Sequence, residues 1–129
     1  MPTLDVPGLA DGPLRAEATL RGGTLSLTLT GNADMRVMSQ LHLLLTRIHH
    51  EAQRLGLKEV AVDVRGLEFM NSSCFKNFVT WINEVRESVA DTQYRIRFLS
   101  NPDLLWQRRS LHALCAFAKE LITVETPVG

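Results

Sequence analysis

The spacing of hydrophobic positions changes several times along the chain, and each spacing predicts a different element. Between Thr24 and Thr30, leucines alternate with threonine or serine, which is the period of two expected for a strand with one buried face. The stretch 14–20 predicts another strand, and Gly22 and Gly23 form a turn signal between the two. We therefore expect a hairpin at the start of the fold.

After Gly31 and Asn32, which we expect to break the second strand, the apolar spacing becomes helical. Asn32 or Asp34 is expected to cap the start of this helix, and Gly56 is expected to end it. Its apolar face comprises Val37, Met38, Leu41, Leu44, Leu45, Ile48, Ala52 and Leu55. The short apolar run 60–64 then predicts a central strand that is covered on both faces.

A second amphipathic helix is predicted directly after residue 74, with Trp81 at the edge of its apolar face. That face comprises Phe75, Phe78, Val79, Ile82, Val85 and Val89. The following stretch, 94–99, alternates apolar and arginine residues and predicts a further strand.

Asn101 and Pro102 predict the start of a third helix, because asparagine caps helices and proline suits their first turn. This helix is expected to run to about Lys119, and residues 122–125 predict a last short strand. The inward positions of the helix are expected to be Leu104, Leu111, Leu114, Cys115 and Ala118.

The predicted order of elements is therefore β-β-α-β-α-β-α-β. Strands that alternate with helices imply parallel crossovers, and the hairpin adds an antiparallel pair, so we expect an α/β domain on a mixed sheet. The domain is expected to span residues 14–126, preceded by a leader, residues 1–13, that is rich in proline and glycine.

Charge and cysteine content narrow the classes of function. Lys+Arg and Asp+Glu each number 14, so the formal net charge is zero, which argues against a nucleic-acid binder or a polybasic membrane binder. No apolar run reaches the 18 residues that a membrane span requires. Two cysteines and no secretory signal indicate reduced thiols in a cytoplasmic protein.

The segment 71–74, Asn-Ser-Ser-Cys, is the strongest candidate for a functional site, because there the third predicted strand meets the second predicted helix. The N-terminus of a helix stabilises a phosphate or a phosphorylated serine. The alternative is that Ser72 or Ser73 only caps the helix.

Residues 63–74 read Asp-Val-Arg-Gly-Leu-Glu-Phe-Met-Asn-Ser-Ser-Cys, which resembles the signature of STAS domains, the family of bacterial anti-sigma factor antagonists. That signature has a strand ending in Asp, a short connection, an aromatic-aliphatic pair, and Asp-Ser-Ser-Gly at the start of a helix. The resemblance extends over residues 14–125, because the order of elements also agrees. It implies a single domain with a mixed sheet of four to five strands and three to four helices.

In this family the first serine of the motif is the phosphoacceptor, which corresponds to Ser72 here, with Ser73 as second choice. The resemblance implies a non-catalytic regulator of bacterial transcription. Its unphosphorylated form binds an anti-sigma factor that is also a serine kinase and so frees the sigma factor. Phosphorylation adds about −1.5 to −2 charges, which disrupts the complex, and a PP2C-type phosphatase resets it. We expect the partner to contact Asn71, Ser72, Ser73, Cys74, Lys76, Asn77 and Thr80.

Two positions depart from the family motif: Asn71 stands in place of Asp, and Cys74 in place of Gly. Asn71 removes a carboxylate that could help to present the serine, and Cys74 adds bulk where a kinase would approach the backbone. These departures favour a second hypothesis, a constitutive scaffold or accessory subunit of a signalling assembly or of a lipid-transport ATPase. In that case Ser72 would only cap the helix.

Other candidate chemistry is weaker, and we expect no catalytic residue, metal or cofactor. Cys74 near a helix N-terminus suggests a reactive thiol, but no base accompanies it. His42 and His49, followed by His50, share a helix face without the further ligands of a metal site. Basic residues that could contact an acidic partner, but that we expect to form solvated faces, are Arg95, Arg97, Arg108, Arg109 and Lys119.

Three apolar residues are difficult to place in one core: Leu43, Leu44 and Trp106. They indicate either a groove for a partner or a homodimer, since exposed apolar groups on an uncharged protein favour association. The alternative is that they cover the second face of the sheet.

Overall fold

The computed structural model describes residues 6, 8, 9 and 12–126, and it has the predicted order of strands and helices. The expected leader, 1–13, falls largely outside the described residues. The strands are β1 (Leu14–Arg21), β2 (Thr24–Ala33), β3 (Glu59–Met70), β4 (Arg95–Leu99) and β5 (Ile122–Glu125). The helices are α1 (Met38–Arg54), α2 (Ser72–Glu87) and α3 (Leu105–Phe117), and the short 3₁₀ turns are η1 (Met35–Val37) and η2 (Ala90–Thr92).

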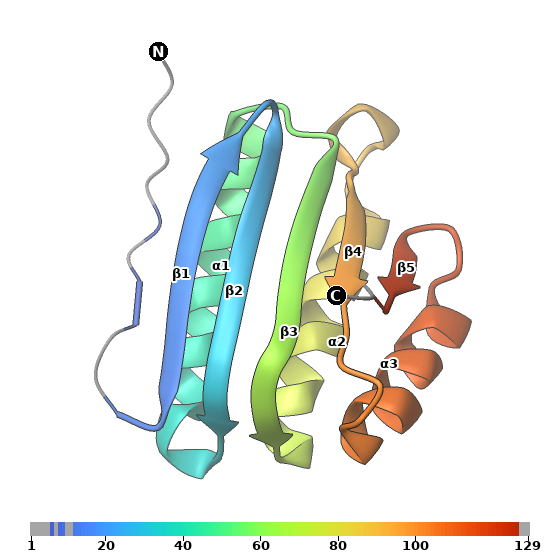
Figure 1. Cartoon of the computed structure of the whole chain (residues 1–129). Coiled ribbons are helices and arrows are strands. Elements are labelled where there is room, and N and C mark those ends of the chain that lie inside the picture. The colour runs from blue at the N-terminus through green and yellow to red at the C-terminus, as the bar shows by residue number, and fades with distance from the viewer. Residues whose placement is uncertain (1–5, 7, 10–11, 127–129) are drawn as a thin grey trace.

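The five strands form one sheet in the order β1-β2-β3-β4-β5 (Figure 1). The hairpin β1–β2 is antiparallel and every other neighbouring pair is parallel, which confirms the α/β fold on a mixed sheet. Gly22 and Gly23 both have positive φ, 58° and 83°, as the tight hairpin turn requires.

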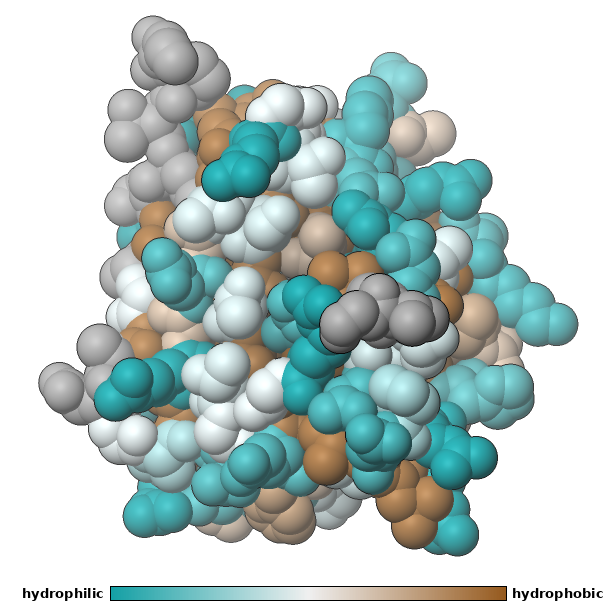
Figure 2. Space-filling model, in the orientation of Figure 1, coloured by the Kyte–Doolittle hydropathy of each residue, from teal (hydrophilic) through white to brown (hydrophobic). Residues whose placement is uncertain are grey.

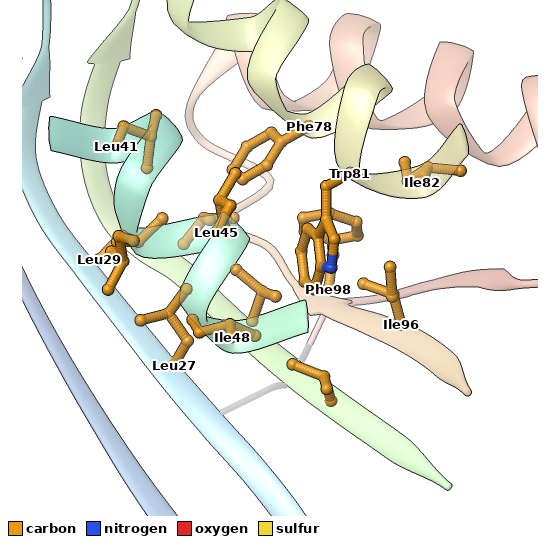
Figure 3. Close-up of a cluster of buried hydrophobic side chains, with 14 of the residues drawn as sticks. Leu27, Leu29, Leu41, Leu45, Ile48, Phe78, Trp81, Ile82, Ile96 and Phe98 are labelled. Atoms are coloured by element: carbon orange, nitrogen blue, oxygen red, sulfur yellow. The ribbon is translucent and has the colours of Figure 1, made fainter. Parts of the chain in front are cut away.

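The α-helices of the described chain all lie on one side of the sheet (Figures 1 and 3). Figure 2 shows the other side, which is mostly hydrophilic. The prediction that β3 is covered on both faces is therefore wrong. Val60, Val62 and Val64 face the helices and are fully buried, whereas Asp63 on the open face is partly exposed. Ala61, also on that face, is only 4% exposed.

The core lies between the sheet and the helices (Figure 3). The side chains of Phe78 in α2 and Phe98 in β4 meet edge to face, with ring centroids 5.4 Å apart. Around them are packed leucines and isoleucines from every layer, including Leu27, Leu29, Leu41, Leu45, Ile48, Ile82 and Ile96. The alternation of leucines in β2 and the helical spacing of apolar residues in α1 place these side chains on the inner side of each element, where they join the core.

The apolar residues that were difficult to place do not cover the second face of the sheet. Leu44 is buried in the core, and Trp106 is half-buried with its indole N–H donating to the carbonyl oxygen of Leu67 at 3.1 Å. Leu43 is 67% exposed on the outer flank of α1. Val89, which was expected in the face of the second helix, lies beyond the end of α2 and is also exposed.

Strand β2 does not end at Gly31 and Asn32 but continues to Ala33, through two shifts of its register with β3. Gly31 has φ 97°, and a Cβ atom there would collide with the carbonyl oxygen of Pro13. The glycine is thus required by a close approach of two backbone segments rather than by a turn. Asp34 then caps η1, so that α1 begins at Met38.

The third helix begins at Leu105, three residues after Pro102, where the sequence predicts its start. The side chain of Asn101 accepts a hydrogen bond from the backbone N–H of Asp103 at 2.9 Å, which is a local turn and not a helix cap. The helix is positioned instead by Gln107, which is buried. Its amide nitrogen donates to the carbonyl oxygens of Val64 and Leu67, and its amide oxygen accepts from the backbone N–H of Asn101.

We predict that Gln107→Ala lowers the free energy of unfolding by about 2–3 kcal/mol, because buried backbone groups lose their partners. Urea denaturation measures the change. Arg108→Ala, an exposed neighbour in the same helix, is the control and should change stability by less than about 0.5 kcal/mol. Equal effects of the two substitutions would contradict the positioning role of Gln107.

Candidate functional site

Strand β3 leads into α2 through Asn71 alone, without the short connection that the family signature implies between the strand and the helix. It extends to Met70, and the backbone N–H of Asn71 still donates to the carbonyl oxygen of Ala33 at the end of β2, at 2.9 Å. This hydrogen bond attaches the start of α2 to the carboxyl edge of the sheet, beside η1. This is the edge where open α/β sheets place their functional groups.

Asn71 caps α2. Its side-chain oxygen accepts a hydrogen bond from the backbone N–H of Cys74 at 2.8 Å, and its backbone oxygen accepts the first helical bond from Phe75 at 3.0 Å. The expectation that Ser72 or Ser73 acts as the cap is therefore wrong. Asparagine and aspartate cap helices about equally well, so the departure from the family motif keeps the cap and removes only a charge.

Ser72 occupies the first position of α2 and is exposed. Its hydroxyl makes no hydrogen bond to any residue that the structure describes. Ser73, the second choice, is only partly exposed. The Ser72 hydroxyl thus stands at a helix N-terminus, where backbone N–H groups and the helix dipole stabilise negative charge.

Cys74 points into the protein and is fully buried. Its thiol donates to the carbonyl oxygen of Asp34 at 3.3 Å. Burial, and secondly the negative charge of Asp34, raise the pKa of the Cys74 thiol, which argues against a reactive thiolate. Its bulk fills the space beneath the helix start and does not obstruct an approach to Ser72 from outside.

The remaining residues of the expected contact surface divide into two groups. Lys76 and Thr80 are exposed, and their spacing of four places them in one row with Ser72 along α2. Asn77 is partly exposed, and its side-chain amide donates to the carbonyl oxygen of Met38 at 3.2 Å. Asn77 therefore ties α2 to α1 behind the exposed row.

Two exposed apolar side chains that sequence reasoning missed lie in the segments next to the start of α2, namely η1, which contacts α2, and the end of β3. Met35 in η1 is 60% exposed, and Phe69, two residues before the cap, is 48% exposed. Their signal in the sequence was only that neither fits the apolar spacing of a strand or helix. Arg36 beside Met35 binds the Asp34 carboxylate at 2.6 Å, and these hydrogen bonds lower the pKa of Asp34.

A chain of two hydrogen bonds links α2 to α1 through Tyr94. The indole N–H of Trp81 donates to the hydroxyl oxygen of Tyr94 at 2.7 Å, and that oxygen lies 2.7 Å from Nδ1 of His49 in α1. Because the indole can only donate, we infer that Tyr94 donates its proton to an unprotonated Nδ1. Trp81 is thus buried rather than at the edge of the apolar face.

Burial lowers the pKa of His49, and the neighbouring charge of His50 acts in the same direction, while Glu84 of α2 opposes it. His42 and His50 are exposed. Within the described residues, no group of three or more His, Cys, Asp or Glu side chains could hold a metal ion. The face shared by His42 and His49 is therefore not completed as a metal site by any described residue.

The basic residues of β4 and α3 do not gather at this edge as one patch. Arg97 lies on the open face of the sheet and pairs with Glu59 at 3.0 Å and Glu125 at 3.2 Å. Arg108, Arg109 and Lys119 are exposed along α3 and just beyond it.

None of the helices in the described chain is long and apolar enough to cross a bilayer.

We predict that Asn71→Ala lowers the free energy of unfolding by about 1 kcal/mol, because the backbone N–H of Cys74 loses its acceptor. Ser72→Ala should change it by less than about 0.5 kcal/mol, since the hydroxyl caps nothing. Chemical denaturation of both variants provides the measurement. A larger loss of unfolding free energy for Ser72→Ala than for Asn71→Ala would show that the serine, and not Asn71, caps the helix.

We predict that stability falls as the pH is lowered below 6.5, the ordinary pKa of histidine. The folded state holds His49 neutral, so the unfolded chain takes up the proton first, and stability is lost until the pH passes the lower folded pKa. His49→Gln should flatten this slope in the free energy of unfolding, whereas the exposed control His50→Gln should keep it. An unchanged slope in His49→Gln would refute the assignment.

Comparison with known proteins supports the fold at low sequence identity. No family model matches the sequence, and no curated protein matches it either. An anti-sigma factor antagonist from Mycobacterium paratuberculosis superposes with a TM-score of 0.63 at 15% identity, covering 89% of this chain and 86% of that one.

Two further solved structures are similar. The anti-sigma factor antagonist SpoIIAA in its unphosphorylated form gives a TM-score of 0.58 at 15% identity, covering 86% of this chain and 88% of its own. The protein TM1081 gives 0.56 at 7% identity, covering 84% and 78%. The resemblance drawn from residues 63–74 is thereby confirmed at the level of the fold: the chain has a STAS-like fold.

Proposed function

We propose that this domain is a regulatory protein-binding module of the anti-sigma factor antagonist kind, and that phosphorylation of Ser72 releases its partner. The observation that carries the proposal is the position of Ser72. Its hydroxyl is exposed at the first residue of α2 and makes no hydrogen bond within the described part of the chain, because Asn71 caps the helix. The fold shared with two anti-sigma factor antagonists supports the same function.

The chemistry of the surface explains how a phosphate would act as a switch. A phosphoserine adds about −1.5 to −2 charges. At Ser72 this charge would be stabilised by the N-terminus of α2 and by Lys76 one turn later in the exposed row. A partner docked over the start of α2 would then have to bury this charge.

The proposed contact residues are Ser72, Lys76 and Thr80, with Ser73 as the alternative phosphoacceptor. Asn71, Cys74 and Asn77 belong to the same segment and hold it in place through their hydrogen bonds. The proposed partner is an anti-sigma factor with serine kinase activity, in the cytoplasm of a bacterium, and the domain itself performs no catalysis. Transcription would then be regulated through release of the sigma factor.

The second candidate is a constitutive scaffold or accessory subunit, in a signalling assembly or a lipid-transport ATPase. One observation favours it: Asn71 keeps the helix cap with an amide, whereas the family motif has a carboxylate at this position that could help to present the serine to a kinase. In this case the exposed row would bind its partner irrespective of the charge at Ser72.

We predict that Ser72→Asp weakens partner binding at least tenfold, whereas Ser72→Ala retains it. Wild type and both variants are used to capture proteins from the native lysate, and the affinity for the captured partner is then measured. Thr19→Asp provides the matched control, since it adds the same charge at an exposed position on β1, far along the sheet from Ser72.

Capture of an ATP-binding, kinase-like protein by wild type, Ser72→Ala and Thr19→Asp, and its loss with Ser72→Asp, would support the switch. Equal capture of the same partner by wild type and Ser72→Asp would overturn it in favour of the scaffold.

A further inference from the structure

Helix α3 lies at the edge of the helix layer, so one of its sides has no neighbouring helix (Figure 1). Only three of its 13 residues are buried, namely Gln107, Leu111 and Leu114, whereas α2 buries five of 16. The remainder of α3 presents a broad outer face to solvent. The exposed residues of this face are Leu105, Arg108, Arg109, His112, Ala113, Ala116 and Phe117.

The exposed residues form one continuous surface along the helix. Leu105, Arg109, His112 and Ala116 follow each other at spacings of four, three and four, which places them in a single line on the outer side. Ala113 lies beside that line. The two alanines leave room for the backbone of a partner to approach α3 closely.

The charges of this face are positive and unpaired. Helix α3 contains no Asp or Glu, and neither Arg108 nor Arg109 makes an ion pair with any residue that the structure describes. Glu120, beyond the helix, binds Arg86 at 2.9 Å, and Asp103, two residues before the helix, pairs with neither arginine. The neutralising carboxylates would therefore come from another molecule.

The segments that pack against α3 are all within the described residues. Strand β5 contacts the helix, Arg86 of α2 donates to the carbonyl oxygen of Phe117, and Trp106 and Gln107 donate to carbonyl oxygens of β3. None of these contacts brings a carboxylate to the exposed arginines. The first turn of α3 also has no acidic residue and no side-chain cap, so nothing there offsets the positive end of the helix dipole.

Large apolar side chains are exposed at both ends of this cationic face. Leu105 is 56% exposed, and Phe117 at the other end is also exposed. Removing such side chains from water favours association, while arginine–carboxylate contacts fix its direction. The 13 residues of α3 span about 20 Å, which is the length of a partner helix of three to four turns.

A membrane surface fits this face less well than a protein does. Helices that lie in a bilayer interface bury a broad apolar face in the lipid and place basic residues on the opposite, polar face. In α3 the apolar stripe of Leu111 and Leu114 is already buried in the core, and the centre of the outer face is charged. The zero net charge of the chain disfavours nucleic acid as well.

We propose that the outer face of α3 binds an acidic, amphipathic helix of a protein partner. Carboxylates of that helix contact Arg108, Arg109 and His112, and one of its apolar side chains packs against Leu105. This surface is independent of the proposed switch, because it lies on another helix, shares no residue with the Ser72 row and is tested without phosphorylation.

The test is titration of the full chain with a synthetic peptide, three repeats of Glu-Ala-Leu-Glu-Glu-Ala-Leu, followed by the backbone amide signals in NMR spectra. We expect saturable shifts concentrated in residues 105–117. Binding should weaken as salt is added, because salt screens exposed charges. The same peptide with Lys in place of every Glu should bind at least tenfold more weakly.

Substitutions separate the two parts of the surface. Arg109→Glu and Leu105→Ser should each weaken binding of the acidic peptide about tenfold. The matched controls are Arg21→Glu, exposed at the end of β1 on the opposite edge of the sheet, and Leu43→Ser, exposed on α1. Both controls should bind as the wild type does. Unchanged melting temperatures of the four variants establish that they are folded.

Three results would overturn the proposal: no saturable binding of the acidic peptide, shifts centred outside residues 105–117, or equal binding by Arg109→Glu and wild type. Vesicles of phosphatidylserine and phosphatidylcholine and a single-stranded oligonucleotide are titrated in parallel. Tighter binding of either one to residues 105–117 would assign the face to a membrane or to nucleic acid, and would equally overturn it.

Discussion

The hydrogen bonds of one residue, Asn71, join the sheet to the second helix, and the arrangement of the candidate site depends on them. Its backbone N–H reaches the end of β2 at Ala33, and its side chain holds the backbone of Cys74. With both bonds in place, α2 starts at the sheet edge without any loop. The next side chain, Ser72, is then directed to solvent with its hydroxyl free of any structural task among the described residues.

The order of elements could be predicted from the sequence because it depends on local periodicity. The Leu-Thr alternation of β2 and the helical stripe of α1 each report which side of an element is buried. The predictions were wrong where a residue distant in the sequence determines the local conformation. Gly31 is typical of a turn, yet its close approach to the carbonyl of Pro13 lies within a strand. Asn101 forms a local turn instead of a helix cap, and α3 begins at Leu105, where Gln107 anchors it. That helices cover only one face of β3 has no local signal at all.

The candidate site could be predicted in place but not in detail. The junction of the third strand with the second helix marked Ser72 correctly as a residue at a helix N-terminus. Which of the three neighbouring polar residues, Asn71, Ser72 or Ser73, caps that helix is decided by backbone geometry, and Asn71 has the suitable extended conformation. The direction of Cys74 follows from the helical phase of α2, and the exposure of Met35 and Phe69 has no local signal in the sequence.

The chain carries only two tryptophans, and their surroundings differ enough to make them separate natural fluorophores. Trp81 is enclosed between α1, α2 and β4, with its indole bonded to Tyr94, so its emission reports on the interior. Trp106 is half-buried and bonded to Leu67 near the carboxyl edge of the sheet, where solvent and collisional quenchers can reach it. Quenching with iodide could therefore distinguish events at the functional edge from loosening of the core, with no dye attached.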